Sequence, residues 1–306
     1  MKLVRRWFSF VALFICAATT VVACAGGNTS GDVIRVGSKD FAEQLILGEM
    51  YALMLEDAGY AVERKLNLGG TPVAQAALES NEIDLYPEYT GTGLLTVLKE
   101  PVSSDPNEVF DTVSSQYQEQ FNLVWLTPAP MNNTQALAMT RERSDELGIT
   151  TISEFAEQAN NLTLIGPPEF EVREDGLPGI QSAYGDFQLK EYKAVDQGLR
   201  YKGLVDGEAD VAVAFGTDGE ISAFDLVVLE DDQQLFPPYQ VAPVVRQEAL
   251  DATPEIETIL NELSPAITDE VMQTLNYAVT GEEREPEEVA QTFLVENGFL
   301  EETDAE

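Results

Sequence analysis

The sequence predicts an α/β protein of two lobes, in which the chain leaves the first lobe, builds the second and then returns. About 280 residues follow the N-terminal segment, which is too many for one small core and fits two compact lobes. Apolar segments typical of strands alternate with helical patterns along this length. This alternation indicates parallel sheets with right-handed crossovers and with helices packed on their faces.

The first third of the chain shows the order strand, helix, strand, helix, strand. In the first predicted helix the apolar residues recur near helical spacing, and Gly59 follows its end. The second predicted helix has Pro72 in its first turn, where the missing N–H has no helical partner to lose. The predicted elements, in chain order, are a strand at 33–36, a helix at 41–58, a strand at 62–66, a helix at 72–80 and a strand at 83–85.

A second set of strands follows and predicts a second sheet. Its apolar run at 211–215 is typical of a buried parallel strand. From residue 254 onward the pattern is helical, and we expect these helices to pack back on the first lobe. The other predicted strands are 135–140, 162–165, 226–229 and 241–245. The predicted lobes are 33–131 plus 238–306 for lobe I and 132–237 for lobe II, with crossings near 132–135 and 236–239.

The N-terminus is typical of a lipoprotein signal peptide covering residues 1–23. A basic start precedes an apolar run at 7–20, and small residues lead to Cys24. The apolar run is short for a membrane-spanning helix, although an uncleaved N-terminal anchor remains the alternative. We therefore predict lipidation at Cys24, a flexible tether over 24–32, and an extracytoplasmic location in the cell envelope, anchored to the membrane by lipid.

The composition excludes several classes of chemistry. The chain has no histidine, and its two cysteines are Cys16 in the signal and Cys24. The mature body therefore has no disulfide, no thiol nucleophile, no zinc cluster of the usual kind and no catalytic triad with histidine. We expect no catalytic residue, no metal and no cofactor, and carboxylate catalysis is the enzyme class that stays open.

The charge of the chain excludes another class of partner. With 17 basic and 54 acidic residues the formal net charge is −37, so nucleic acid and anionic lipid surfaces are not expected partners. The acidic surface is consistent with solubility or with adaptation to salty or acidic surroundings, and the sequence does not separate the two.

Polar, small and aromatic residues follow three predicted strands in the first lobe. They form the phrases at 36–44, 67–71 and 84–92. In α/β proteins, ligands bind in the crevice beyond the carboxyl ends of the strands. Together with the phrases at 132–134, 215–219 and 236–239, these segments resemble the glycine betaine/choline-binding proteins of ABC importers, the OpuAC-like family. The resemblance covers the chain from residue 33 to about residue 300.

This resemblance implies a type II periplasmic-binding-protein fold with two hinge crossings. It further implies that the protein is not an enzyme. It would capture a small quaternary ammonium ligand by closure of the cleft and deliver it to an ABC permease, with ATP hydrolysis on a separate ATPase subunit.

A quaternary ammonium head determines the kind of site to look for. The trimethylammonium group has a permanent charge and no N–H to donate, and a buried carboxylate opposite it would be costly to desolvate. Aromatic faces attract it by about 0.5–2 kcal/mol per ring when water is excluded. The carboxylate of a betaine, in contrast, needs a cation, hydroxyls or backbone N–H groups.

The resemblance assigns this chemistry to seven residues. A glutamine amide has hydrogen-bonding groups but no π face, so Gln135 departs from the aromatic residue that the family has at this position. Arg173 lies among acidic residues, so a salt-bridge role is its alternative. Glu43 and Glu88 could form a carboxylate pair, but acidic residues are too common here for that to carry weight. The implied aromatic cage is Tyr89, Phe215, Tyr239 and the position of Gln135, and the implied contacts to the ligand carboxylate are Lys39, Thr92 and Arg173.

Three alternatives remain open at this point. The importer could carry another ligand, such as ergothioneine or an amino-acid-like osmolyte. The same lobes could serve a sensor instead of a transporter. A carboxylate-dependent surface hydrolase would need two carboxylates facing each other across a polar groove.

Overall fold

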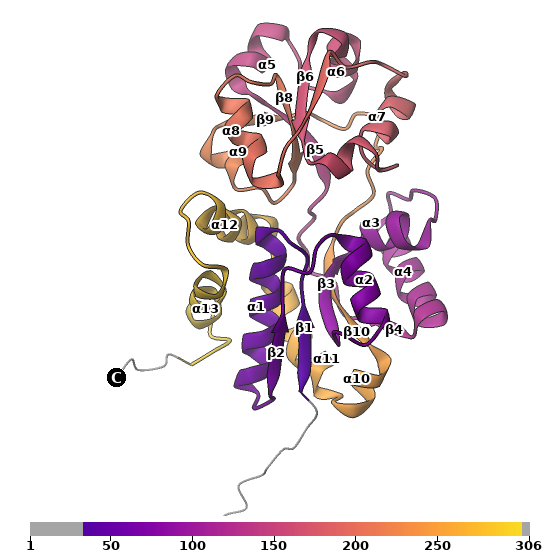
Figure 1. The fold of residues 1–306 in the computed structure, drawn as a ribbon, viewed down its shortest axis with the longest axis vertical. Helices are drawn as coiled ribbons and strands as arrows, with labels where there is room; N and C mark the ends of the chain where they lie inside the picture. Colours follow the sequence, from indigo (N-terminus) through magenta and orange to yellow (C-terminus); the bar gives the residue numbers. More distant parts are fainter. Residues whose placement is uncertain (1–32, 302–306) are drawn as a thin grey trace, which may run out of the picture. The chain divides into compact units, whose positions relative to one another are not determined.

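The computed structural model describes residues 33–301 and builds them on two separate five-stranded sheets (Figure 1). The first sheet has the strand order β2-β1-β3-β10-β4, and the second has the order β7-β6-β8-β5-β9. Two sheets with surrounding helices confirm the two-lobed α/β prediction. The predicted signal peptide, the tether and the lipidation site at Cys24 lie outside the described residues.

The first sheet contains the predicted order of alternating strands and helices. β1 pairs in parallel with both β2 and β3, as the pattern predicts. The third strand is longer than predicted, so Tyr89 is its last residue rather than part of the following loop. These elements are β1 (Ile34–Gly37), α1 (Ala42–Asp57), β2 (Val62–Lys65), α2 (Thr71–Glu79) and β3 (Leu85–Tyr89).

The rest of the first sheet was not predicted in full. β10 lies between β3 and β4 and runs antiparallel to both, because it enters from the second lobe and not through a crossover helix. Helix α4 and strand β4 were not predicted from the sequence. The elements are α3 (Thr90–Thr92), a π-helix (Gly93–Leu98), α4 (Pro106–Phe121), β4 (Leu123–Trp125) and β10 (Val241–Arg246).

Strand β3 is buried on both of its faces. Leu85 and Tyr89 pack with the core under α1, whereas Tyr86 packs with the core under α2 and α4. This alternation follows from the two-residue period of a strand. The alternation places Glu88 on the same face as Tyr86, where its side chain is fully buried. A buried carboxylate needs a partner, and the partner of Glu88 is described with the site below.

The second sheet is also mixed. β6 is parallel to β7 and β8, and β5 is antiparallel to β8 and β9. Its strands are β5 (Gln135–Thr140), β6 (Thr163–Gly166), β7 (Glu191–Ala194), β8 (Val211–Phe215) and β9 (Leu226–Val228). Its helices are α5 (Arg141–Leu147), α6 (Ile152–Gln158), α7 (Leu177–Tyr184), α8 (Arg200–Val205) and α9 (Glu220–Ala223).

Two segments connect the lobes, one between β4 and β5 and one between β9 and β10. They hydrogen-bond to each other. The backbone N–H of Tyr239 donates to Asn132 Oδ1 at 2.7 Å, and the N–H of Asn133 donates to the carbonyl of Tyr239 at 3.1 Å. This pair of crossings agrees with the predicted hinge, while the residue boundaries of the lobes stay a prediction.

The C-terminal helices pack on the first lobe as expected, because α1 contacts α11, α12 and α13 (Figure 1). Helix α12 also reaches the second lobe. Gln273 Nε2 donates to the carbonyl of Gly216 at 2.9 Å, and α12 contacts α9. The helices are α10 (Gln247–Ala252), α11 (Glu255–Leu263), α12 (Asp269–Thr280) and α13 (Pro286–Glu296).

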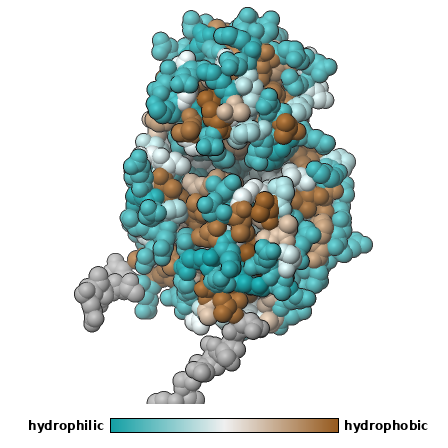
Figure 2. Space-filling view, viewed as in Figure 1, coloured by the Kyte–Doolittle hydropathy of each residue, from teal (hydrophilic) through white to brown (hydrophobic). Residues whose placement is uncertain are grey.

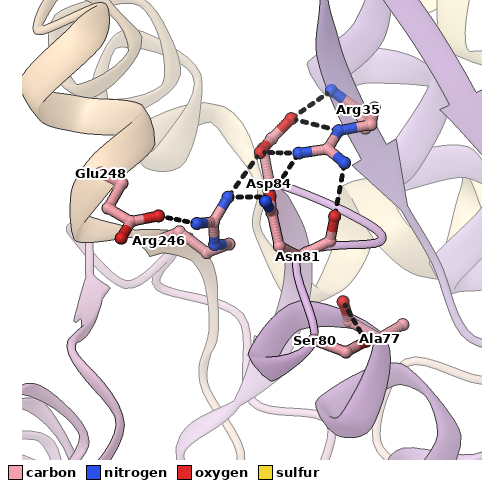
Figure 3. A network of polar contacts seen from close by, with 7 residues as sticks. All are labelled: Arg35, Ala77, Ser80, Asn81, Asp84, Arg246 and Glu248. Carbon is pink, nitrogen blue, oxygen red and sulfur yellow. Dashed lines mark hydrogen bonds and ion pairs between the residues drawn. The ribbon is translucent and has the colours of Figure 1, made fainter.

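A polar network joins β1, the residue before β3 and β10 (Figure 3). Asp84 accepts from the backbone N–H of Arg35 at 2.8 Å and from its Nη2 at 2.7 Å. Arg246 Nη1 reaches the same carboxylate at 3.1 Å. The network holds the start of β3 against its two neighbours, which in turn positions the far end of β3 at the site described below.

On the face shown in Figure 2, hydrophilic residues cover most of the surface and hydrophobic patches lie between them. Within residues 33–301, the helices are all too short or too polar to span a bilayer.

Candidate ligand-binding site

Residues of both lobes line a cavity of about 760 Å³. All seven residues to which the sequence analysis assigned a ligand contact lie on its wall, although they come from six separate segments of the chain. They are Lys39, Tyr89, Thr92, Gln135, Arg173, Phe215 and Tyr239. The structure therefore brings the seven together in one place, and their contacts with each other show what each can offer a ligand.

Lys39 already has a partner inside the protein. Its side chain is 4% exposed, and its Nζ lies 2.6 Å from Oε1 of Glu88, which is fully buried. Nζ also lies 5.1 Å from the centre of the Tyr89 ring. Burial lowers the pKa of Lys39, against the opposing charge of Glu88. The lysine predicted for the ligand carboxylate thus contributes a cation whose charge is largely balanced by Glu88.

Arg173 also has an ion-pair partner inside the protein, Asp175. Arg173 Nε donates to Asp175 Oδ1 at 2.7 Å, so the alternative salt-bridge role of Arg173 exists in the structure. Burial acts to raise the pKa of Asp175, but the hydrogen bond and charge of Arg173 outweigh it and hold that pKa below its ordinary value. Arg173 still lines the cavity, with a charge shared between Asp175 and any ligand.

Asp175 also organises two predicted members of the aromatic cage. Its Oδ2 accepts from Tyr239 OH at 2.8 Å and from Gln135 Nε2 at 2.9 Å. The same amide nitrogen donates to Tyr239 OH at 2.8 Å. Gln135 therefore positions a tyrosine and a carboxylate, which is a role that the sequence analysis did not consider for it.

The ring of Phe215 has a cation close by. The guanidinium of Arg200 lies 5.3 Å from the ring centre, and Arg200 pairs with Asp218. The N–H of Phe215 donates to Asp218 Oδ2 at 2.7 Å, which fixes the end of β8. The sequence analysis missed Arg200 and Asp218 as lining residues, although Asp218 stands in the phrase at 215–219 that it singled out.

Tyr89 and Thr92 follow one another around the end of β3. Tyr89 stacks on Phe41, with ring centres 6.3 Å apart and planes inclined by 20°. Thr92 lies in α3, after Gly91, where a Cβ would meet the Tyr239 ring at 2.8 Å and the Pro238 carbonyl at 2.9 Å. Only glycine at position 91 allows this close approach of α3 to the return crossing.

Two further aromatic residues line the cavity, Phe41 and Phe170. Phe41 is the first residue of the helix predicted at 41–58. In the structure it is the N-cap residue of α1 with an extended backbone. Its position directly after Lys39 and Asp40, inside the first of the three phrases, was the signal that could have identified it.

Glu43 is a buried carboxylate at the cavity wall. Its side chain is 3% exposed and lies in the first turn of α1. Four neutral groups donate to it, and burial nevertheless raises the pKa of Glu43. The donors are Tyr89 OH at 2.7 Å, Asn133 Nδ2 at 2.7 Å, Asn276 Nδ2 at 2.8 Å and the hydroxyl of Thr217. The sequence analysis set Glu43 aside because acidic residues are common in this chain.

The described residues 33–301 hold no group of three His, Cys, Asp or Glu side chains placed to bind a metal ion. The cavity instead offers aromatic rings, paired cations and several carboxylates. This set suits a small ligand that carries a positive charge on an apolar head.

Two α/β lobes joined by two crossings, with an aromatic cavity lined from both, define a two-lobed substrate-binding protein. Comparison with known families agrees. The model of the substrate-binding domain of ABC-type glycine betaine transport systems, OpuAC, matches residues 32–296, and the chain belongs to this family.

Individual relatives support the assignment. The chain is 36% identical to a glycine-betaine-binding protein of Pseudomonas aeruginosa, over 93% of this chain and 95% of that protein. It is 35% identical to the ergothioneine transport permease/ergothioneine binding protein EgtU of Helicobacter pylori, covering 96% of this chain but 53% of that longer relative. Among solved structures, a glycine betaine/carnitine/choline ABC transporter protein matches with a TM-score of 0.74 and 30% identity, over 87% of this chain and 99% of that one.

Proposed function

We propose that this protein captures a small quaternary ammonium compound of the glycine betaine or choline type and delivers it to an ABC permease with its ATPase subunit. It would act outside the cytoplasmic membrane, anchored through a lipid on Cys24, and would carry out no catalysis. One observation supports the ligand class above all others. Tyr89, Phe215 and Tyr239 line one cavity, where three rings could supply several kcal/mol of attraction to a desolvated cation.

Closure of the lobes would complete the site. Tyr89 and Thr92 belong to the first lobe, Arg173 and Phe215 lie in the second, and Tyr239 lies at the return crossing. A ligand that touches both walls binds the closed form better than the open form, and this difference in affinity shifts the protein toward closure. Under this proposal Arg173, which Asp175 holds in place, receives the polar end of the ligand.

A thermal-shift screen followed by calorimetry tests the proposed ligand. The purified protein, freed of any co-purified ligand, would be titrated with glycine betaine, choline, carnitine, ergothioneine and amino acids. We expect a quaternary ammonium compound to raise the melting temperature most, because ligand that binds only the folded state stabilises it by mass action. Stabilisation by amino acids alone, with no response to any quaternary amine, would reject the proposal.

Ergothioneine is the second candidate ligand, and two observations favour it. A relative of 35% identity is named for ergothioneine, and Gln135 places an amide where an all-aromatic cage would have a ring. A ligand with a polar ring could use the hydrogen-bonding groups around Asp175.

Replacing Gln135 with tyrosine separates these two ligands. If the protein is a betaine or choline binder with an incomplete cage, the added ring should tighten binding by about 0.5–2 kcal/mol, or about twofold to thirtyfold. Isothermal titration of both variants with choline, glycine betaine and ergothioneine gives the answer. Gln135→Leu is the matched control, because it removes the amide without adding a ring. Loss of ergothioneine binding in both variants, with no gain for choline or glycine betaine, would instead identify Gln135 as a contact that reads a polar ligand.

A further inference from the structure

Glu43 differs from three other carboxylates at or near the cavity, the buried Glu88 and Asp175 and the half-buried Asp218. Each of the three has a cation at ion-pair distance, in the pairs Glu88–Lys39, Asp175–Arg173 and Asp218–Arg200. Glu43 receives hydrogen bonds from neutral groups, and among residues 33–301 no Lys or Arg forms an ion pair with it. Neutral hydrogen-bond donors therefore solvate the charge of Glu43, but no cation of the described residues balances it.

A buried carboxylate without a cation partner destabilises the folded protein. An ionised carboxylate removed from water is strongly disfavoured unless it is paired, and hydrogen bonds from neutral donors offset only part of that penalty. A hydrocarbon-like alternative at this position would avoid the penalty altogether. The chain instead places four donors around Glu43, and these favour its ionised form against the burial that raises the pKa of this carboxyl.

The donors come from parts of the structure that meet only at the cavity. Tyr89 ends β3, Asn133 lies in the first crossing, Thr217 follows β8 and Asn276 is on α12. Tyr89 is also a predicted member of the aromatic cage, and its hydroxyl lies 2.7 Å from Glu43 Oε1. A cation held against the face of this ring would thus have the carboxylate beyond the edge of the same ring, at a distance where unit charges still attract if water is excluded.

We propose that Glu43 is a binding residue for the ligand and supplies the counter-charge to its positive head. This inference rests on the proposed function and assigns the head group to the side of the cavity formed by Tyr89 and Glu43. The ligand needs no N–H for this interaction, because attraction between unit charges acts without a hydrogen bond and is strong where water is excluded. The site would therefore select the charge of the head group in addition to its shape.

The test compares a cation with a neutral molecule of the same shape. Choline and 3,3-dimethylbutan-1-ol differ by a positively charged nitrogen in place of a carbon. We expect Glu43→Gln to weaken choline binding by about tenfold or more and to leave binding of the neutral alcohol within about threefold, measured by calorimetry or by competition. Glu49→Gln is the matched control, because Glu49 is a buried carboxylate on the same helix that pairs with Arg64 and does not line the cavity.

A merely structural role for Glu43 predicts a different pattern. If Glu43 only holds its four donors in place, Glu43→Gln should weaken choline and the neutral alcohol to the same degree, and that result would overturn the inference. Unchanged choline affinity in the variant would overturn it as well. Glu43→Asp keeps the charge and should recover part of the choline affinity that glutamine loses.

The wild-type protein alone provides an independent check. If Glu43→Gln does not fold, equal affinity of the wild type for choline and for the neutral alcohol still rejects a charge-selecting site. A wild type that binds no quaternary ammonium compound refutes the proposed function itself, and this outcome is distinct from a wild type that binds choline with no dependence on Glu43.

Discussion

Replacing Glu88 with glutamine is expected to lower the free energy of unfolding by about 3–5 kcal/mol, because it leaves the buried ammonium group of Lys39 without its counter-ion. Both side chains are buried, and the two charged atoms lie 2.6 Å apart. The amide oxygen of glutamine can take the place of Oε1 and accept from the N–H of Tyr89. Its new NH2 group then takes the place of Oε2 and faces Tyr86 OH, whose oxygen can accept, so the change acts mainly on the charge. Urea denaturation at pH 7 measures the loss.

The double variant Lys39→Met with Glu88→Gln is the control for this prediction. It removes both charges, and we expect it to recover most of the stability that the single variant loses. A single variant as stable as the wild type would show that the pair is not buried in solution.

The pH dependence gives a second check on the same variant. Without Glu88, burial should lower the folded-state pKa of Lys39 further below its unfolded value of about 10.4. Between those two pKa values the unfolded state binds more protons, so stability rises with pH. The destabilisation by Glu88→Gln should therefore shrink as the pH is raised from 7 toward 10.

Tyr239→Ala is expected to weaken binding of the quaternary ammonium ligand by about tenfold or more, at roughly 1.4 kcal/mol per tenfold. The change removes one aromatic face from the cavity. It also takes away the hydroxyl that donates to Asp175 at 2.8 Å and accepts from Gln135, so the neighbouring polar groups lose their arrangement. Calorimetric titration with the best ligand from the screen measures the effect.

Tyr239→Phe separates the two contributions. It keeps the ring and loses only the hydroxyl, so we expect a smaller loss of affinity than for alanine. If alanine and phenylalanine weaken binding equally, the hydroxyl matters and the ring does not, and the cation–π basis of the site would be wrong. Unchanged affinity in Tyr239→Ala would remove Tyr239 from the site.

The seven residues assigned from the sequence line one cavity, but the ion pairs and hydrogen bonds among them and their neighbours were not predicted. The residues at the carboxyl ends of parallel strands converge because those ends share one edge of a sheet. Gln135 and Tyr239 reach the cavity differently, at the start of β5 and just before β10, which both run antiparallel to their neighbours. The ion-pair partners of the site residues could not be predicted from the sequence. With 54 acidic residues in the chain, nothing local distinguishes Glu88, which is 49 positions from Lys39, from any other carboxylate. The pairing of Lys39 with Glu88 cannot be predicted from the sequence, because the two residues are far apart in the chain and carboxylates are abundant.

Two elements that were not predicted, β7 and α4, share a physical reason. Strand β7 has an exposed and half-buried pattern with polar residues at an edge of the sheet, so it lacks the apolar signal of a central strand. Helix α4 has a polar composition with only a few buried residues. Phe41 was misassigned because an aromatic residue at the start of a helix fits the helical period as well as it fits a cap, and only the backbone angle separates the two.

Helix α12 has a consequence for how long a ligand stays bound. Its Gln273 and Asn276 donate to the carbonyls of Gly216 and Thr217, each at 2.9 Å, so any opening that separates β8 from α12 must break both bonds. We expect these bonds to re-form only on closure and therefore to leave the rate of encounter with the ligand unchanged. We expect them to act on escape, which makes the C-terminal helices a determinant of residence time although most of their length lies away from the cavity.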